Sequence, residues 1–268
     1  MVLVIKIGNR ALSGTLSNEA LSDLEQVYAT NPTIIVHGGG DTVTEIAERL
    51  GLTQRFVTSP EGFKSRYTDG ETIQVYTMVM AGRVNKEIVR TLARQKLPAF
   101  GLSGLDGGLI RAKRKTRLVA KTDDNRKRVI EGGYTGRITS VETSVLEMLL
   151  QSNYIPVIAP VAIGEDFEIL NIDGDRAASA VAAATKADVL LFLTDVNGIT
   201  ISGTQIPRMN AEQAKTILPE LGPGMITKTY AALEALAKGV SKVVIAPANV
   251  RQPFSSALGG MTGTEIGH

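Results

Sequence analysis

The sequence contains no cysteine and only two histidines, His37 and His268. These absences exclude disulfide frameworks, thiolate metal sites, thiol nucleophiles and histidine-rich metal sites. No stretch approaches the roughly 18 to 20 apolar residues of a transmembrane helix, and no low-complexity linker or internal repeat is present. We therefore expect a cytoplasmic globular protein without membrane attachment. Its chemistry must depend on lysine, arginine, aspartate, glutamate and backbone dipoles.

The composition that remains is that of an ordinary globular protein, with 43% hydrophobic and 21% charged residues, 27 Gly and 10 Pro among 268. This length suits one large α/β unit or two modest lobes. The net charge of +2 is unevenly distributed. Nine basic residues between Arg111 and Arg128 oppose only Asp123 and Asp124, which gives +7 in this segment and −5 elsewhere. Such a local field attracts an anionic partner.

Short β-branched runs alternate with longer helical patterns along the chain. Strands are expected at residues 2–7, 33–36, 99–102, 155–158, 187–193 and 242–245, and helices at 18–28, 42–50, 71–96, 141–152, 176–186, 211–218 and 228–238. This alternation predicts βαβ units and a parallel sheet that is covered on both faces. Residues 109–119 and 126–131 interrupt the pattern and predict a charged antiparallel hairpin inserted into the α/β core. A lobe boundary is expected near Pro160.

Two glycine-containing turns follow predicted strands, in Lys6-Ile7-Gly8-Asn9 and in His37-Gly38-Gly39-Gly40. A turn of this kind before a helix exposes backbone N–H groups to an anion. It is equally typical of a tight βα connection that needs glycine for conformational reasons. Neither a Walker P-loop nor a Rossmann G-x-G-x-x-G motif occurs, which argues against those two nucleotide sites. The two turns together favour anion binding.

Three charged residues are candidates for phosphate chemistry. Lys6 lies beside glycine at the carboxyl end of a predicted parallel strand, where ligands of α/β sheets bind. Lys228 opens an alanine-rich helix, and Asp175 stands at the start of another helix. The alternative interpretations are solvent-facing lysines and a helix-capping aspartate.

Motifs spread along the whole chain resemble, in their order, those of the amino acid kinase family. They are Lys6-Ile7-Gly8, Val36-His37-Gly38-Gly39-Gly40, Ser65-Arg66-Tyr67-Thr68-Asp69, Gly101-Leu102-Ser103-Gly104-Leu105-Asp106-Gly107, Asn171-Ile172-Asp173-Gly174-Asp175, Thr194-Asp195-Val196-Asn197-Gly198-Ile199 and Gly224-Met225-Ile226-Thr227-Lys228. Within the family the chain is similar to the N-acetylglutamate kinase branch. It is most similar to the subgroup whose substrate is attached to the amino-group carrier protein LysW, in lysine or arginine biosynthesis. The motif at residues 65–69, Leu105 and the basic Lys113-Arg114-Lys115-Thr116 suggest this subgroup.

The resemblance implies a three-layer αβα sandwich with a mainly parallel central sheet, built as a single amino acid kinase domain. Residues 1–160 would form a lobe for the acyl substrate and for homodimerisation, and residues 161–268 a lobe for ATP. The resemblance also implies ATP with Mg²⁺, which phosphates and water would mainly hold, so no metal-ligating side chain is expected. The acceptor would be a carboxylate, which is ionised at pH 7 and needs no general base.

The resemblance further implies a role for individual residues. Lys6 and Lys228 would stabilise charge on the transferred phosphoryl group, and Asp175 would hold both lysines in place. The substrate would contact Gly39, Gly40, Arg66 and Asn171, and the nucleotide would contact Gly8, Asn9, Asp195 and Gly198. Asn9 departs from the family, which usually has glycine there, but asparagine tolerates the left-handed conformation better than most residues.

The basic segment Arg111 to Arg128 would dock the acidic carrier LysW, which bears an aminoadipyl or a glutamyl group. A nucleic-acid-binding module and a solvated hairpin without a partner are the other interpretations of this segment. It contains no Phe, Tyr or Trp that could stack on bases, so we expect no nucleic-acid partner. Among enzymes, the alternative is a kinase for free N-acetylglutamate, which would share every catalytic residue. Uridylate and carbamate kinases fit the motif at residues 65–69 less well.

Overall fold

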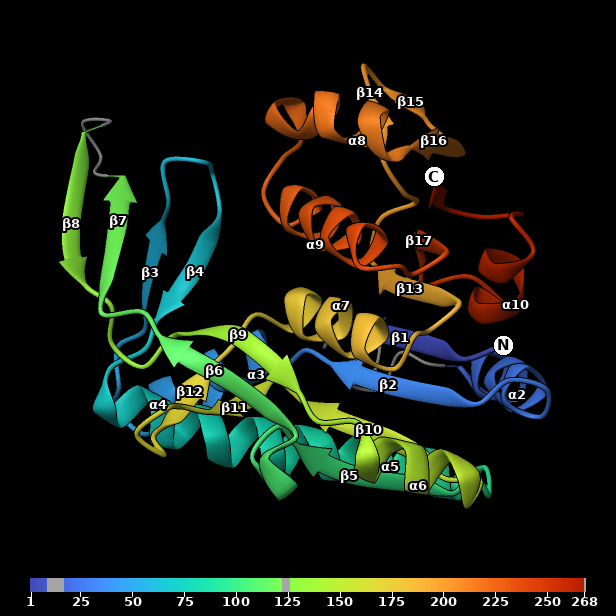
Figure 1. The fold of residues 1–268 in the computed structure, drawn as a ribbon, viewed down its shortest axis with the longest axis horizontal. Coiled ribbons are helices and arrows are strands. Elements are labelled where there is room, and N and C mark those ends of the chain that lie inside the picture. The colour runs from blue at the N-terminus through green and yellow to red at the C-terminus, as the bar shows by residue number, and fades with distance from the viewer. Residues whose placement is uncertain (9–16, 122–125, 268) are drawn as a thin grey trace.

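The computed structural model describes residues 1–8, 17–121 and 126–267, and an eight-stranded sheet lies at its centre (Figure 1). From one edge to the other the strands are β16 (Arg208–Asn210), β18 (Thr264–Gly267), β17 (Lys242–Pro247), β13 (Val189–Thr194), β1 (Leu3–Ile7), β2 (Thr33–His37), β10 (Ile155–Ala159) and β5 (Ala99–Ser103). Strands β17 and β18 are antiparallel, and every other neighbouring pair in this sheet is parallel. The prediction of a mainly parallel sheet is confirmed.

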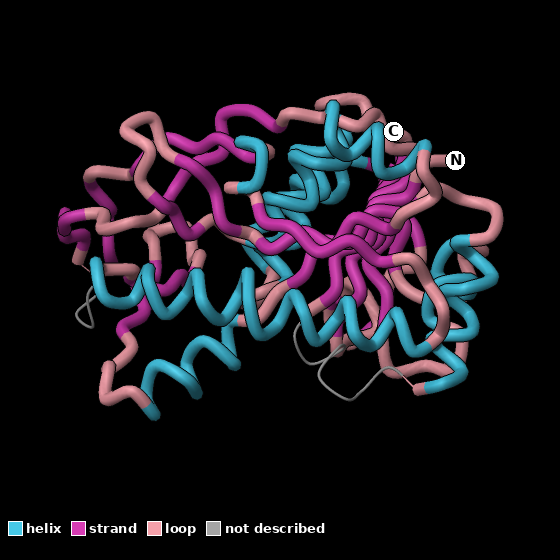
Figure 2. The backbone as a smooth tube through the Cα atoms, turned by 90° about the horizontal axis from the view of Figure 1, so that it is seen from below, coloured by secondary structure: helices cyan, strands magenta, loops and turns pink. Residues whose placement is uncertain are grey.

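Helices cover both faces of the sheet, which is therefore the middle layer of three (Figure 2). One face is covered by α2 (Asn18–Tyr28), α3 (Gly40–Arg49), α4 (Gly70–Thr77), the π-helical stretch η1 (Met78–Val84), α5 (Asn85–Arg94) and α10 (Pro253–Leu258). The other face is covered by α6 (Ser144–Gln151), α7 (Gly174–Ala184), α8 (Ala211–Ile217) and α9 (Met225–Ala237). The predicted αβα sandwich is confirmed. Within the described ranges, no helix combines the length and the apolar character that crossing a bilayer requires.

The side chains of β1 alternate between the two faces of the sheet, as in any strand. Leu3, Ile5 and Ile7 join the core on the α2 side, whereas Val4 joins the core on the α7 side. By the same alternation Lys6, near the end of β1, lies on the α7 side. The strand therefore directs one lysine to the helix layer that begins at α7.

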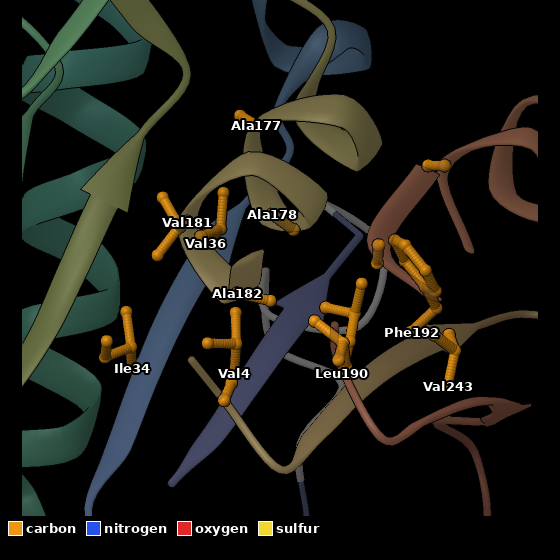
Figure 3. Packing of buried hydrophobic residues seen from close by; sticks show 14 of the residues in the cluster. Val4, Ile34, Val36, Ala177, Ala178, Val181, Ala182, Leu190, Phe192 and Val243 are labelled. Atoms are coloured by element: carbon orange, nitrogen blue, oxygen red, sulfur yellow. The ribbon is translucent and has the colours of Figure 1, made fainter. Parts of the chain in front are cut away.

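Helix α7 packs closely on the sheet because its inward side chains are small. Figure 3 shows Ala178 and Ala182 facing the strands that carry Val4 and Val36. All four of these side chains are buried. The close packing brings the first turn of α7 next to the carboxyl ends of β1 and β2, where a Cβ on Gly174 would lie 3.5 Å from the His37 carbonyl oxygen and 3.6 Å from Lys6 Cε.

Smaller sheets stand at one end of the molecule and at its C-terminal side. A four-stranded sheet has the order β12 (Ile169–Asn171), β11 (Val161–Ile163), β6 (Ile110–Arg114) and β9 (Gly136–Val141). Two-stranded antiparallel sheets are formed by β3 (Arg55–Thr58) with β4 (Lys64–Tyr67), by β7 (Arg117–Lys121) with β8 (Lys127–Glu131), and by β14 (Thr200–Ile201) with β15 (Thr204–Gln205). The β3–β4 and β7–β8 hairpins lie side by side and project from the same end of the molecule (Figure 1). Single 3₁₀ turns occur at η2 (Asp106–Gly108) and η3 (Leu218–Glu220).

The predicted basic hairpin exists, but residues 109–119 do not form one continuous strand, so this part of the prediction is wrong. Strand β6 ends at Arg114 and pairs with β9, whereas β7 begins at Arg117 and pairs with β8. The chain crosses between the two sheets at Lys115, whose N–H donates to the Thr135 carbonyl (2.8 Å). A Cβ on Gly132 would lie 1.5 Å from the Lys115 carbonyl oxygen, so the crossing requires glycine there.

Of the predicted helices, only the one at residues 18–28 has the same boundaries in the structure, and the helix expected from residue 228 begins at Met225. The helix expected from residue 42 begins at Gly40, with Gly39 as its N-cap. The helix expected from residue 141 begins at Ser144, because Val141 still pairs with Ile110 at the end of β9. The helix expected at 71–96 is continuous but contains the π-helical stretch η1.

Candidate active site

Asp175 forms ion pairs with two lysines from distant parts of the chain. Lys6 Nζ lies 2.9 Å from Asp175 Oδ1, and Lys228 Nζ lies 3.1 Å from Asp175 Oδ2. Lys6 ends β1, Asp175 lies in the first turn of α7, and Lys228 lies in the first turn of α9. The Asp175 side chain is 7% exposed and that of Lys228 is 15% exposed. Residues 6, 175 and 228 thus meet at one largely buried point, which we call the lysine–aspartate cluster.

Asp175 is available for this cluster because Asp173 caps α7 instead. The Asp173 carboxylate accepts a hydrogen bond from the backbone N–H of Arg176 (2.9 Å), the usual geometry of an N-cap. The helix-capping interpretation of Asp175 and the surface interpretation of Lys228 are therefore wrong.

Asp175 and Lys6 keep their charges at neutral pH. Burial alone would raise the pKa of the Asp175 carboxyl, but the positive charges of Lys6 and Lys228 outweigh burial and hold this pKa below its usual value. Burial would lower the pKa of Lys6, but Asp175 outweighs it and raises this pKa. Burial and the nearby Asp175 charge raise the pKa of Asp173. Asp175 is therefore a carboxylate that holds charged lysine.

A cavity of about 280 Å³ opens beside the cluster and is rich in positive charge. It is lined by six basic side chains and two acidic ones, Lys6, Lys64, Arg66, Lys115, Arg137, Arg176, Asp173 and Asp175. Residues of the Gly38–Gly40 turn and of segments 135–138 and 171–174 also line it, as do Ser65, Tyr76, Met80 and Pro160. We call this space the basic cavity. Its charge suits a ligand with several negative groups.

Arg66 is held in one wall of the basic cavity. Its Nη2 donates to the Gly40 carbonyl oxygen (2.7 Å) and to Thr44 Oγ1 (2.9 Å), and its Nη1 donates to Gln54 Oε1. The guanidinium also stacks over the Phe56 ring, 4.9 Å from its centroid. Burial lowers the pKa of Arg66, but a guanidinium remains charged in proteins. The side chain is thus a fixed positive charge in that wall.

The Gly38–Gly40 turn places the N-terminus of α3 at the basic cavity. Gly39 is fixed by close packing, since a Cβ there would lie 2.5 Å from Met80 Sδ. A Cβ on Gly40 would meet nothing nearer than Arg66 Nη2 at 3.9 Å, so the backbone at this point is open. Free N–H groups at a helix N-terminus favour an anionic ligand.

Asn171 lines the cavity from the end of β12. Its Nδ2 donates to Thr68 Oγ1 (2.8 Å), and its backbone N–H donates to the Tyr134 carbonyl (2.9 Å). Tyr134 N–H in turn donates to the Thr68 carbonyl (2.6 Å). The amide of Asn171 is therefore oriented by the segment that precedes α4.

The nucleotide-contacting candidates lie outside the basic cavity, at the carboxyl ends of adjacent strands. Gly8 follows β1, and Asp195 follows β13, which pairs with β1 up to Ile7 and Leu193. Asp195 Oδ1 accepts from Thr194 Oγ1 (3.1 Å). Gly198 has φ 127°, and a Cβ there would lie 2.7 Å from Thr264 Oγ1. Asn9 lies outside the described residues.

The sequence did not indicate four basic residues of the cavity: Lys64, Lys115, Arg137 and Arg176. Arg176 forms a two-point ion pair with Glu234, with Nε 2.9 Å from Oε2. Lys115 had been assigned to the hairpin surface, because the crossing between sheets leaves no sequence signal. Two of the four stand next to a motif that the sequence offered: Lys64 directly precedes residues 65–69, and Arg176 directly follows Asp175.

The amino acid kinase family model matches residues 1–247. The chain is 41% identical to a LysW-aminoadipate/LysW-glutamate kinase of Saccharolobus islandicus over 266 residues, 99% of each chain. It is 48% identical, over 266 residues and 99% of each chain, to a protein of Cenarchaeum symbiosum whose name proposes the same activity.

Solved structures have the same fold. The smu.665 protein of Streptococcus mutans superposes with a TM-score of 0.81 at 25% identity, over 99% of this chain and 98% of that one. Carbamate kinase of Giardia lamblia superposes with a TM-score of 0.64 at 16% identity, over 99% and 98% of the two chains. On the family match, the full-length relatives and the shared fold, the chain belongs to the amino acid kinase family.

Proposed function

We propose that the chain catalyses the ATP-dependent phosphorylation of the side-chain carboxylate of an aminoadipyl or glutamyl group carried on LysW, in lysine or arginine biosynthesis. The observation that carries this proposal is the lysine–aspartate cluster at the wall of the basic cavity. The names of full-length relatives at 41 to 48% identity support the carrier-linked substrate.

Lys6 and Lys228 act on the phosphoryl group in transfer. Phosphoryl transfer needs alignment and stabilisation of negative charge more than covalent chemistry, and the attacking carboxylate needs no base. Two ammonium groups fixed by one carboxylate supply that stabilisation without reorganising during the reaction. Asp175 is the residue that positions both lysines.

The acceptor binds in the basic cavity between this cluster and Arg66. The Arg66 guanidinium binds the α-carboxylate, and the N–H groups of Gly39 and Gly40 contact the substrate at the start of α3. Asn171 binds the amide region, with its side chain oriented by Thr68.

ATP binds on the other side of the cluster, at the strand ends that carry Gly8, Asp195 and Gly198, with Asn9 assigned from the sequence alone. Residues 1–160 are then the lobe for the acceptor and for homodimerisation, and residues 161–268 the lobe for ATP. In the described part of the chain, no group of three His, Asp or Glu side chains could hold a metal ion. Mg²⁺ would therefore be held mainly by the nucleotide phosphates, where it supplies further positive charge.

The carrier docks on the exposed basic side chains of the β7–β8 hairpin. Arg117, Lys121, Lys127 and Arg128 are all exposed there. Lys113 instead pairs with Glu165 (3.7 Å), and Arg114 Nε donates inward to the Gly133 carbonyl (2.6 Å). Of the predicted segment Arg111 to Arg128, the part on β7 and β8 is thus the best placed to meet a partner. The cytoplasmic location and the homodimer stay predictions from the sequence.

The test is an ATP-consumption assay that offers free N-acetylglutamate, LysW-linked aminoadipate and LysW-linked glutamate side by side. We expect turnover of at least one carrier-linked substrate and none above background in Asp175→Asn. Turnover of free N-acetylglutamate alone would overturn the proposal in favour of an acetylglutamate kinase.

A further inference from the structure

Three cations in the basic cavity have no role in the proposed function: Lys64, Lys115 and Arg137. Lys64 is exposed and lies over the Phe56 ring, 5.2 Å from its centroid. Lys6 is paired with Asp175, Arg176 is paired with Glu234, and Arg66 is assigned to the α-carboxylate. Lys115 and Arg137 also line the cavity, and neither forms an ion pair with any residue that the structure describes.

The backbone of Lys115 is fixed at the point where the chain crosses from β6 to β7. Its N–H donates to the Thr135 carbonyl (2.8 Å), and its carbonyl packs against Gly132, where no side chain fits. The side chain is only partly exposed. Burial lowers its pKa, as do the positive charges of Arg176 and Arg137, and Asp173 opposes them only in part. A partly buried ammonium without a carboxylate partner is costly unless an anion binds beside it.

Arg137 lies close to Lys115 on β9. Thr135 contacts Lys115 through the backbone, and Arg137 is two residues farther along the same segment, next to Gly136. Arg137 is exposed and also lines a neighbouring hollow of about 480 Å³ between β9 and α7. Its guanidinium is therefore free to adjust, and this group binds carboxylates at two points.

Apart from the exposed Lys64 and from Arg176, which is paired with Glu234, the positive charges of the cavity form three groups on different elements. The lysine–aspartate cluster comes from β1, α7 and α9, Arg66 comes from β4, and Lys115 with Arg137 comes from the β6–β7 crossing and β9. An acylated glutamate or aminoadipate has two carboxylates, which match the first two groups. A ligand that also uses the third group must carry a further negative charge on the substituent of its amino nitrogen.

We propose that Lys115 and Arg137 form a second carboxylate-binding subsite in the basic cavity, which binds an acidic residue of the carrier segment joined to the acceptor's amino nitrogen. The inference rests on the proposed function, since it concerns the acceptor of that reaction. It makes these two residues determinants of specificity for a carrier-linked substrate. A simple acetyl group offers this subsite no charge.

The subsite can be tested without the carrier, by calorimetric titration in the presence of a non-hydrolysable ATP analogue. N-succinylglutamate and N-butyrylglutamate differ mainly in a terminal carboxylate on the acyl group. We expect the wild-type protein to bind the succinyl compound about tenfold more tightly, the value of one good charged hydrogen-bonded contact. Equal affinity, or no measurable binding of either compound, would overturn the inference.

Substitutions test whether Lys115 and Arg137 cause this preference for the succinyl compound. Lys115→Met keeps the length of the side chain without its charge, and Arg137→Leu removes the guanidinium. Each substitution should reduce the preference to about threefold or less, and the double variant should abolish it. Lys121→Met is the matched control, because it removes an exposed charge of the same hairpin outside the cavity, and it should keep the full preference. Unchanged thermal midpoints and nucleotide affinity will establish that the variants are folded. A preference that survives in the double variant contradicts the assignment.

Failure of the inference can be distinguished from failure of the proposed function. If the wild type phosphorylates carrier-linked substrate but shows no succinyl preference, the subsite is wrong and the function stands. If the preference is present but no carrier-linked substrate reacts, the function is wrong and the subsite stands. In the first assay, Lys115→Met should also raise KM for carrier-linked substrate at high salt, because the cavity is less screened than the surface.

Discussion

At the scale of single residues, the most consequential contact is one carboxylate shared between two lysines. Asp175 bonds Lys6 through one oxygen and Lys228 through the other, so neither lysine can move without losing its partner. Removing one of these charges leaves a buried charge without its partner. The resulting loss in the free energy of unfolding exceeds the net stabilisation that the intact ion pair provides. Local stability therefore depends on the same three side chains that the proposed mechanism uses.

We expect Lys6→Ala and Lys228→Ala each to lower kcat by about 100-fold or more while changing KM for the acceptor far less. The reason is that the contacts of these lysines strengthen as charge develops in the transition state. Steady-state kinetics measure both constants, with Lys238→Ala at the far end of α9 as the control. A near-normal kcat in either variant would remove that lysine from the mechanism.

At the scale of elements, His37 ties three parts of the fold together. It ends β2, and its Nδ1 donates to the Gly38 carbonyl (2.9 Å) while its Nε2 accepts from Asn85 Nδ2 (3.2 Å). Asn85 begins α5 and also donates to the Val157 carbonyl on β10 (2.8 Å). Burial lowers the pKa of His37 to about 4. The neutral ring is therefore the folded form.

This pKa predicts a pH dependence of stability. An unfolded histidine titrates near 6.5, so the contribution of His37 is complete above that pH and is lost as pH falls towards 4. The loss amounts to about 3 kcal/mol in the free energy of unfolding. Denaturant unfolding of wild type and His37→Gln between pH 7 and pH 4 measures it. Parallel pH profiles for the two proteins would show that His37 does not titrate in this range.

Runs of apolar residues decided which strands could be predicted from the sequence. Strands β1, β2, β10, β13 and β17 each contain three or more consecutive apolar residues, and their pattern is unambiguous. Strands β11, β12, β14, β15 and β16 have two or three residues, too few to show a period, and they were missed. The longer strands β3, β4, β9 and β18 were also missed, because none of them has three consecutive apolar residues.

The residues of the candidate site also differ in whether the sequence could identify them. Lys6, Asp175 and Lys228 were identified because each stands in a motif, and the order of the motifs is informative. Arg137 stands in no motif, and Lys115 stands in the basic Lys113-Arg114-Lys115-Thr116, which was assigned to carrier docking and not to the acceptor site. The place of both residues in the cavity depends on where the chain crosses between two sheets. That crossing is fixed by the packing of Gly132, which is a tertiary contact.

At the scale of the whole molecule, charge is concentrated at the end where the two hairpins project. Lys64 belongs to the β3–β4 hairpin and Lys115 leads into β7, and both line the basic cavity. The exposed cations of β7 and β8 therefore lie on a hairpin that begins two residues after Lys115, in the wall of the cavity. A surface of this kind acts mainly on association rates, and salt screens it.

We expect the triple variant Lys121→Glu, Lys127→Glu and Arg128→Glu to raise KM for carrier-linked substrate and to flatten its salt dependence. Screening shortens from about 10 Å at 0.1 M salt to about 3 Å at 1 M, so the wild type should approach the variant at high salt. An untethered acyl-amino acid should be bound equally by both proteins, because these side chains lie outside the cavity. Equal losses on both ligands would mean that the hairpin shapes the cavity.

The central position of β1 has a consequence for synthesis of the chain. This strand precedes its neighbours in the chain, since its second neighbour, β13, begins only at Val189, and the second lysine of the cluster is residue 228. At a synthesis rate of about 5 to 20 residues per second, one edge of β1 stays unpaired for roughly ten to forty seconds, until β13 has been made. An incomplete chain has an open strand edge that invites aggregation. It also lacks the lysine–aspartate cluster, so unfinished molecules do not compete for substrate as active enzyme.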